Sequence, residues 1–238
     1  MHLKNFQIIM AKKTTRTEEN IQAVEEVLSK SEQFIEDNQK PILYVVGILI
    51  LIVLVYFGFQ RFYLIPKEAT AQEQIFMAEK YFEMDSLDLA LNGDGLNPGF
   101  LDIIDDYKFT KTANLAHFYA GVSYMEKGDY ETAIDYLKNF DGNDQIVAAM
   151  GLGAIGDCLI ELGNSKKAAD YYLEAANDDE NEFTSPLFLM KAGWTYEIMK
   201  DYNKALNCYK QIKEDYPQSN EAREMDKYIA RINGYLKK

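Results

Sequence analysis

The sequence predicts an all-α protein in which a single transmembrane helix precedes an α-solenoid built from repeated helix pairs. One observation behind this fold class is a run of 19 uncharged, mostly apolar residues. Another is a pattern of glycine, aromatic and alanine residues that recurs after the run. The net charge of −13 lies almost entirely in the residues after the uncharged run, which include 19 basic and 31 acidic residues. Such an acidic domain repels nucleic acid and anionic lipid headgroups, and no basic patch in the sequence offsets this.

Residues 1–39 are expected to divide into two parts. Residues 1–16 form a disordered leader, and the chain could start at Met1 or at Met10. Residues 17–39, TEENIQAVEEVLSKSEQFIEDNQ, place apolar side chains on one face of a helix, with Thr17 as its cap. The opposite face is acidic, whereas a helix that lies on an anionic membrane is basic. We therefore expect an amphipathic cytoplasmic helix that packs on a protein or only extends the anchor.

Residues 40–65 are expected to form the transmembrane helix. The uncharged run, PILYVVGILILIVLVYFGF from Pro41 to Phe59, would rise about 28 Å as a helix, close to the thickness of a hydrocarbon core. Aromatic rings lie near both ends, where they prefer the headgroup level. A cleaved signal peptide is disfavoured because 40 residues precede the run. Lys and Arg residues close to the run are almost evenly divided between its two sides. Those of the wider N-terminal tail favour a cytoplasmic N-terminus.

The stretch GLGAIG, Gly151 to Gly156, matches the G-x-G-x-x-G pattern of dinucleotide-binding proteins. That pattern predicts a phosphate site only where it follows a strand and where a second strand ends on an acidic residue about 20 positions later. The residues that follow, ELGNSKKAADYYLEAAND, have a helical pattern instead. We therefore expect no dinucleotide and no other cofactor.

Three segments after the apolar run superimpose, and they explain these glycines. The segments are residues 117–140, 152–175 and 189–212. Each has a glycine in its first helix and an alanine twelve residues later, with glycine spacings of 35 and 37. The pairs are Gly121 and Ala133, Gly156 and Ala168, and Gly193 and Ala205. Such small residues allow the two helices of a unit to touch, so Gly156 has a structural place, and Gly153 is expected to open the groove beside it.

This pattern resembles the tetratricopeptide repeat, a helix-turn-helix of about 34 residues. The resemblance implies a repeat domain over residues 66–238. Its parts are a degenerate unit at 67–110 with an inserted polar turn, units at 113–145, 148–182 and 185–217, and a capping helix at 219–236 that begins at Ser219. Separate helices of this length are marginal in water, and stacking buries their apolar faces.

No constellation of residues favours an enzyme. The acidic clusters Asp105-Asp106 and Asp178-Asp179-Glu180 lie outside the frame of a calcium loop. Cys158 and Cys208 have no C-x-x-C spacing and are expected to be core thiols, and two histidines cannot build a metal site alone. We expect no catalytic residue and no metal.

The first helices of the repeat units are instead expected to line a partner-binding groove. Projection of the repeat pattern gives eight groove residues: Phe118, Val122, Met125, Met150, Asp157, Met190, Trp194 and Glu197. Flexible thioethers and an aromatic ring suit a groove that accepts varied apolar segments. The alternative, that some of these residues are simply core, stays open. The Lys, Arg and Asn residues of repeats that clamp a chaperone's C-terminal carboxylate are absent here.

The order of parts, with the stretch IQAVEEVLSKSEQFIEDNQKPILYVVG, resembles the bacterial ancillary subunit of the Sec translocon. The resemblance implies a single-pass inner-membrane protein with a cytoplasmic N-terminus and a periplasmic repeat domain. It implies as partners the translocon channel and a membrane-anchored periplasmic chaperone of the peptidyl-prolyl isomerase class. We expect a chaperone-like adaptor that contacts these partners or emerging secreted clients. The alternative is a scaffold of another envelope assembly, for secretion, division or outer-membrane biogenesis, that binds no client.

Overall fold

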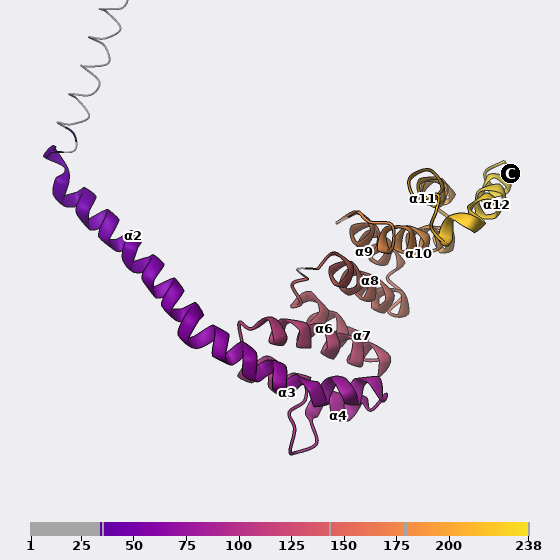
Figure 1. Cartoon of the computed structure of the whole chain (residues 1–238). Coiled ribbons are helices and arrows are strands. Elements are labelled where there is room, and N and C mark those ends of the chain that lie inside the picture. The colour runs from indigo at the N-terminus through magenta and orange to yellow at the C-terminus, as the bar shows by residue number, and fades with distance from the viewer. Residues whose placement is uncertain (1–33, 35, 143, 179, 238) are drawn as a thin grey trace, which may run out of the picture. The chain divides into compact units, whose positions relative to one another are not determined.

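The all-α fold class is confirmed by a computed structural model that describes residues 34, 36–142, 144–178 and 180–237 (Figure 1). These described residues form helices and turns and contain no strand. The expected leader at 1–16 and most of the expected amphipathic helix at 17–39 lie outside them. The chain divides into two compact units after Tyr63, and each unit is considered by itself below.

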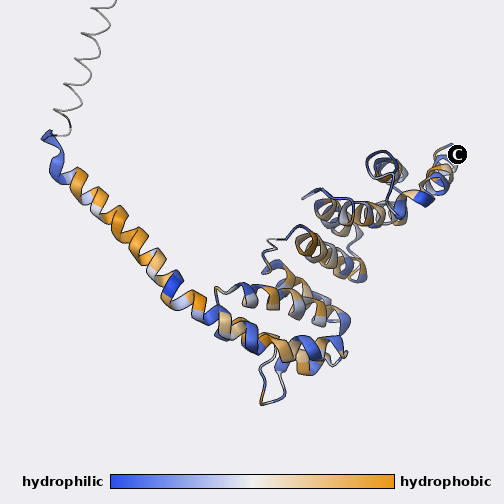
Figure 2. Cartoon of the chain, in the orientation of Figure 1, coloured by the Kyte–Doolittle hydropathy of each residue, from blue (hydrophilic) through white to orange (hydrophobic). Residues whose placement is uncertain are grey.

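The first unit contains the apolar helix. Helix α2 spans Gln39–Phe59, and a π-helical turn, η1, follows at Gln60–Leu64. No side chain of α2 is buried, and Figure 2 shows an almost unbroken apolar colour along it. Among the described residues, the helical stretch that includes α2 is the one long and apolar enough to cross a membrane, by length and composition. A helix with an apolar surface on every side is suited to lipid rather than to water.

The second unit begins with three helices that form a small core together with the helix that follows them. They are α3 at Ile65–Glu83, α4 at Leu87–Asn92 and α5 at Phe100–Asp106, and they lie where the degenerate unit was expected. The fully buried side chains at their centre include Ala78, Leu91 and Phe100. The carboxylate of Glu68 ties α3 to the next helix, because it accepts hydrogen bonds from the backbone amide of Lys111 at 2.7 Å and the hydroxyl of Thr112 at 2.9 Å.

An ordered loop carries the polar insertion between α4 and α5. The carboxylate of Asp94 accepts hydrogen bonds from the hydroxyl of Tyr81, from the backbone amides of Leu96 and Asn97, and from the side-chain amide of Asn97. These bonds, that of Tyr81 first, hold the pKa of Asp94 far below its usual range, since each stabilises the charged carboxylate. The loop is therefore braced, and it presents Leu96 with 93% of its surface exposed.

Three helix pairs follow in chain order, as the repeat pattern predicts (Figure 1). They are α6 at Lys111–Glu126 with α7 at Tyr130–Lys138, α8 at Gln145–Glu161 with α9 at Ser165–Asn177, and α10 at Thr184–Ile198 with α11 at Tyr202–Asp215. Each first helix ends in a turn with positive φ, at Gly128, Gly163 and Lys200. Glycine adopts this left-handed region without strain, and the third unit places a lysine there instead.

The repeated glycines are where the two helices of each unit meet, as predicted. A Cβ atom added to Gly156 would lie 2.5 Å from Cε1 of Tyr172 on α9. One added to Gly121 would lie 2.6 Å from Cγ of Leu137, and one on Gly193 would likewise collide with the ring of Tyr209. Each of these side chains stands four residues after the repeat alanine, so the glycine makes room for the same position of the partner helix in all three units.

The expectation for Gly153 needs correction. Gly153 is buried, and a Cβ there would collide with the ring of Phe188 on α10. It therefore allows close packing between units and does not open a groove. Ser219 makes the hydrogen bond expected of a cap, because its hydroxyl accepts from the backbone amide of Ala222 in a 3-10 turn, η2 at Glu221–Glu224. Helix α12, Met225–Leu236, follows this turn, and its Met225 and Ile232 complete the core of the repeat pairs.

Candidate partner-binding groove

A partly buried polar contact joins the second and third repeat units. The hydroxyl of Tyr172 on α9 donates to Oδ1 of Asp157 on α8 at 2.6 Å. Nζ of Lys191 on α10 reaches both carboxylate oxygens of Asp157, each at 2.8 Å. Burial, and then the bond to Asp157, raise the pKa of Tyr172 far above its usual range, so the phenol remains a hydrogen-bond donor at neutral pH.

The third unit repeats this arrangement with the capping helix. The hydroxyl of Tyr209 on α11 donates to Oε1 of Glu197 on α10 at 2.5 Å, and Arg231 of α12 reaches the same oxygen at 2.6 Å. Burial and the bond to Glu197 raise the pKa of Tyr209 far above its usual range. In both places a tyrosine of the second helix and a cation of the following element hold an acid of the first helix. Asp157 and Glu197 thus serve the stack itself.

A pocket of about 270 Å³ opens between the first and second units, beside Asp157. Met125 of α6 and Ile160 of α8 supply its apolar wall, and Tyr130 and Tyr172 supply rings. Glu161 lies at the pocket as well and makes no ion pair among the described residues. This chemistry accommodates an apolar or cationic side chain of a bound protein.

The eight predicted groove residues fall into four groups by their exposure and contacts. Met150 and Trp194 are open to solvent, at 40% and 44% exposure. Phe118, Val122 and Met125 are partly buried and pack against the core of the repeat pairs. Met190 is only 7% exposed and belongs to that core, so it is removed from the available surface. Asp157 and Glu197 are partly exposed but engaged in the polar contacts described above.

Sequence reasoning missed the partners of these two acids. The signal for the tyrosines was present, because Tyr172 follows Ala168 by four residues and Tyr209 follows Ala205 by four. Lys191 and Arg231 also share an offset, because each follows its acid by 34 residues, the length of one repeat, and the stacking of successive elements brings them together. Ile198, on the last turn of α10 and 66% exposed, adds a further apolar side chain near Trp194.

The two cysteines and the GLGAIG stretch lie inside helices of the repeat units. Cys158 and Cys208 are free and buried, and burial raises the pKa of each thiol to about 11. A thiol with that pKa stays protonated and unreactive near neutral pH. Among the described residues, no group of three His, Cys, Asp or Glu side chains could hold a metal ion. GLGAIG lies inside helix α8, with no strand before it among those residues.

Comparison with known families agrees with this architecture. Models of the tetratricopeptide repeat match residues 115–141, 151–179 and 188–219, which fall on the three helix pairs. No curated protein matches the chain in sequence. The helix pairs, their glycine contacts and these matches define a protein with a tetratricopeptide-repeat solenoid, a class of scaffold for protein–protein interaction.

Proposed function

We propose that this protein is a membrane-anchored periplasmic adaptor that accompanies the Sec translocon and binds partner proteins through the first helices of its repeats. Its partners would be the translocon channel and a membrane-anchored periplasmic chaperone of the peptidyl-prolyl isomerase class, together with emerging secreted chains. The order of parts along the chain supports this proposal: an apolar helix able to span a membrane stands directly before an acidic repeat domain. The N-terminus would be cytoplasmic and the repeat domain periplasmic, in the inner membrane.

The observation that carries a binding role is the surface of α10. Most of this helix is buried, yet Trp194 remains 44% exposed. Tryptophan is a preferred anchor at protein interfaces, since one ring buries a large apolar area at a small cost in conformational entropy. The nearby pocket lined by Met125 and Ile160 offers a second place for an apolar side chain.

Anchoring would supply the affinity that a shallow groove lacks. A weak contact made by a tethered domain behaves as an intramolecular contact at high effective concentration, so no tight site is required. The protein would thus act by location, holding its binding surface close to chains that leave the channel.

Two measurements test the proposal. Mild detergent purification followed by mass spectrometry should recover channel subunits, and their absence would remove the translocon assignment. Site-specific crosslinking to emerging chains should fall at least about fivefold in Trp194→Ala, because losing a central aromatic anchor costs 1 kcal/mol or more. Phe76→Ala, which removes an exposed ring of α3 that is 63% accessible, is the control and should crosslink as the unaltered protein does.

The alternative function is a scaffold of another envelope assembly that contacts no client. It is favoured by Asp157 and Glu197, since these predicted groove residues stabilise the stack instead of remaining free. In that case Trp194→Ala would leave client crosslinking unchanged while the purification recovered a different machine.

A further inference from the structure

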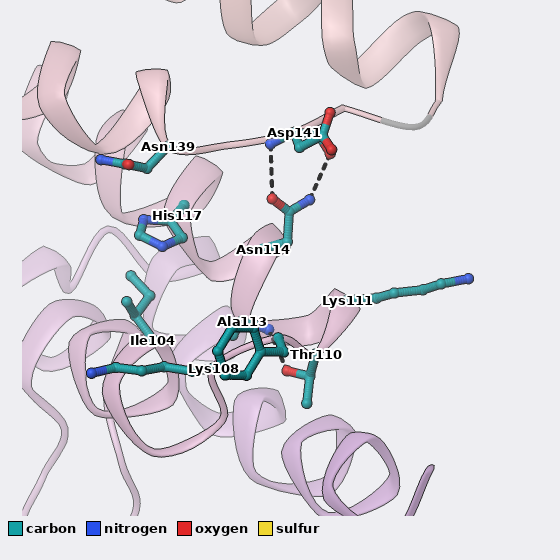
Figure 3. Close-up of a pocket in the computed structure, with 10 residues that line it drawn as sticks. Ile104, Lys108, Thr110, Lys111, Ala113, Asn114, His117, Asn139 and Asp141 are labelled. Carbon is teal, nitrogen blue, oxygen red and sulfur yellow. Dashed lines mark hydrogen bonds between the residues drawn. The ribbon is translucent and has the colours of Figure 1, made fainter. Parts of the chain in front are cut away.

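The largest pocket of the repeat domain, beside Phe109, has polar side chains that do not converge on one ligand. Its volume is about 540 Å³, and it is lined by the connection between α5 and α6, the first half of α6 and the segment after α7 (Figure 3). Lys108 and Lys111 extend in opposite directions from it (Figure 3). Asn114 is occupied by two hydrogen bonds with the backbone of Asp141, at 2.7 and 2.8 Å. A ligand site needs a few polar groups that point at the same place, which this pocket lacks.

The smaller pocket between the first and second repeat units brings unlike groups around a single space. Its volume of about 270 Å³ is below the roughly 300–1,000 Å³ of pockets that hold a drug-sized ligand, so it suits one side chain. Met125 of α6 and Ile160 of α8 form an apolar wall. Tyr130, the first residue of α7, adds a ring, and Glu161, the last residue of α8, adds a carboxylate.

The two carboxylates at this pocket differ in their partners. Asp157 accepts hydrogen bonds from Tyr172 and from Lys191, and the ammonium group of Lys191 balances its charge. The exposed side chain of Glu161 makes no hydrogen bond and no ion pair among the described residues. The pocket therefore presents one uncompensated negative charge, in a domain whose acidic excess attracts cations.

The chain itself shows which side chain fits such a set of groups. In the last turn of α10, Glu197 binds Arg231 of α12 at 2.6 Å, and Cζ of Arg231 lies 4.7 Å from the centre of the Tyr228 ring. Glu161 stands in the last turn of α8, as Glu197 does in α10. The third unit thus has an arginine of its own chain between a carboxylate and a ring. No cation among the described residues pairs with Glu161.

We infer that the pocket between the first and second units binds the side chain of an arginine in a partner protein. The apolar stem of the arginine lies along Met125 and Ile160, and the planar guanidinium stacks on Tyr130 and donates to Glu161. Lysine fits less well, since its ammonium group is compact, strongly hydrated and unable to present a planar fork. The inference rests on the partner-binding role in the proposed function, because it specifies a residue that the partner must carry.

Methyl NMR of the full chain in detergent tests this site without a partner. The probe is N-acetyl-arginine amide, and its control is N-acetyl-citrulline amide, which has nearly the same shape and no charge. The arginine probe should shift the labelled methyl group of Met125 and leave that of Met84, which is 61% exposed at the end of α3, unchanged. The citrulline probe should bind at least about fivefold more weakly, because hydrogen bonds between charged groups are the stronger ones.

Variants of the two polar groups test their separate roles. Glu161→Gln should abolish the preference for arginine over citrulline, because it removes the charge and keeps the shape. Glu214→Gln, which removes the same charge from an exposed position of α11, should retain the preference. Tyr130→Leu removes the ring and keeps an apolar side chain, so the arginine probe should then bind no better than N-acetyl-lysine amide. An unchanged methyl signal of the fully buried Met225 checks that each variant is folded.

The outcomes separate this inference from the proposed function. If Met125 responds equally to arginine and citrulline, or to neither, the arginine site is overturned, and client crosslinking that depends on Trp194 would still support the proposed function. Equal binding of the arginine and lysine probes to the unaltered protein also overturns the choice of arginine. If arginine binds as expected but mild purification recovers no channel subunits, the site stands and the translocon assignment fails.

Discussion

Single glycines determine how closely the helices of a repeat pack, and Gly156 provides the sharpest test. We expect Gly156→Ala to destabilise the repeat domain by about 1–3 kcal/mol, because the added Cβ would meet the ring of Tyr172, which its hydrogen bond to Asp157 holds in place. Denaturant unfolding of the full chain in detergent, followed by the fluorescence of Trp194, measures the change.

Gly234 is the matched control for this prediction. It also lies inside a helix, α12, but a Cβ there would meet no atom within 4 Å. Gly234→Ala should therefore stabilise the protein by up to about 1 kcal/mol, since alanine is the better helix former. Equal destabilisation by both variants would refute the packing role assigned to Gly156.

His117 should make stability depend on pH. Burial lowers its pKa in the folded state below the unfolded value of about 6.5, so the unfolded chain binds the proton more readily. The neutral imidazole makes its full contribution to the unfolding free energy above the unfolded-state pKa. This contribution is lost as the pH falls through the folded-state pKa. The unaltered protein should lose more unfolding free energy between about pH 7.5 and pH 5.5 than His117→Gln does.

The other histidine supplies the control for this pH dependence. His2 lies outside the described residues, in the expected leader, and His2→Gln should keep the full slope of the unaltered protein. A slope that persists in His117→Gln would show that other titrating groups cause it.

At the scale of elements, the sequence predicts the helices well because their signals are local. Glycine and alanine spacing located the three helix pairs, and the polar turn before Phe100 marked the interruption in the first unit. The role of Gly153 could not be predicted in the same way. Its contact with Phe188 crosses between repeat units at a separation of 35 residues, whereas the glycine and alanine pattern describes contacts within one unit.

The polar contact between α8, α9 and α10 should have a measurable energy. Tyr172→Phe removes the hydroxyl that donates to Asp157, and we expect a loss of about 1.5 kcal/mol because the carboxylate loses a well-aligned donor. Tyr171→Phe is the neighbouring control, since its hydroxyl makes no hydrogen bond within the described residues, and it should stay within about 0.5 kcal/mol. Equal losses of unfolding free energy in the two variants would mean that the hydrogen bond from Tyr172 to Asp157 does not stabilise the fold.

At the scale of the whole molecule, the sequence separates an apolar helix from an acidic repeat domain but does not identify the working surface. Projection of the repeat pattern selected Met190 and Trp194 together, and only the three-dimensional packing shows one buried and the other exposed. The pocket beside Phe109 was missed entirely. Its walls come from three separate segments, and the positive φ of Phe109 has no sequence signal.

The division after Tyr63 predicts that the repeat domain folds without the apolar helix α2. A fragment of residues 64–238 should be soluble, helical and cooperative in thermal unfolding, because its core residues all lie on α3 to α12, whereas α2 buries none. Circular dichroism and analytical ultracentrifugation check this.

A shorter fragment, residues 87–238, tests where along the chain the folded repeat domain begins. It lacks α3, and with it the buried Ala71, Ile75 and Ala78 and the bond from Glu68 to the start of α6. Losing one side of a small core leaves Phe100 and Ile103 without cover, so this fragment should melt at a lower temperature and bind hydrophobic dyes. If both fragments unfold at the same temperature, α3 belongs functionally to the anchor and the folded domain begins at α4.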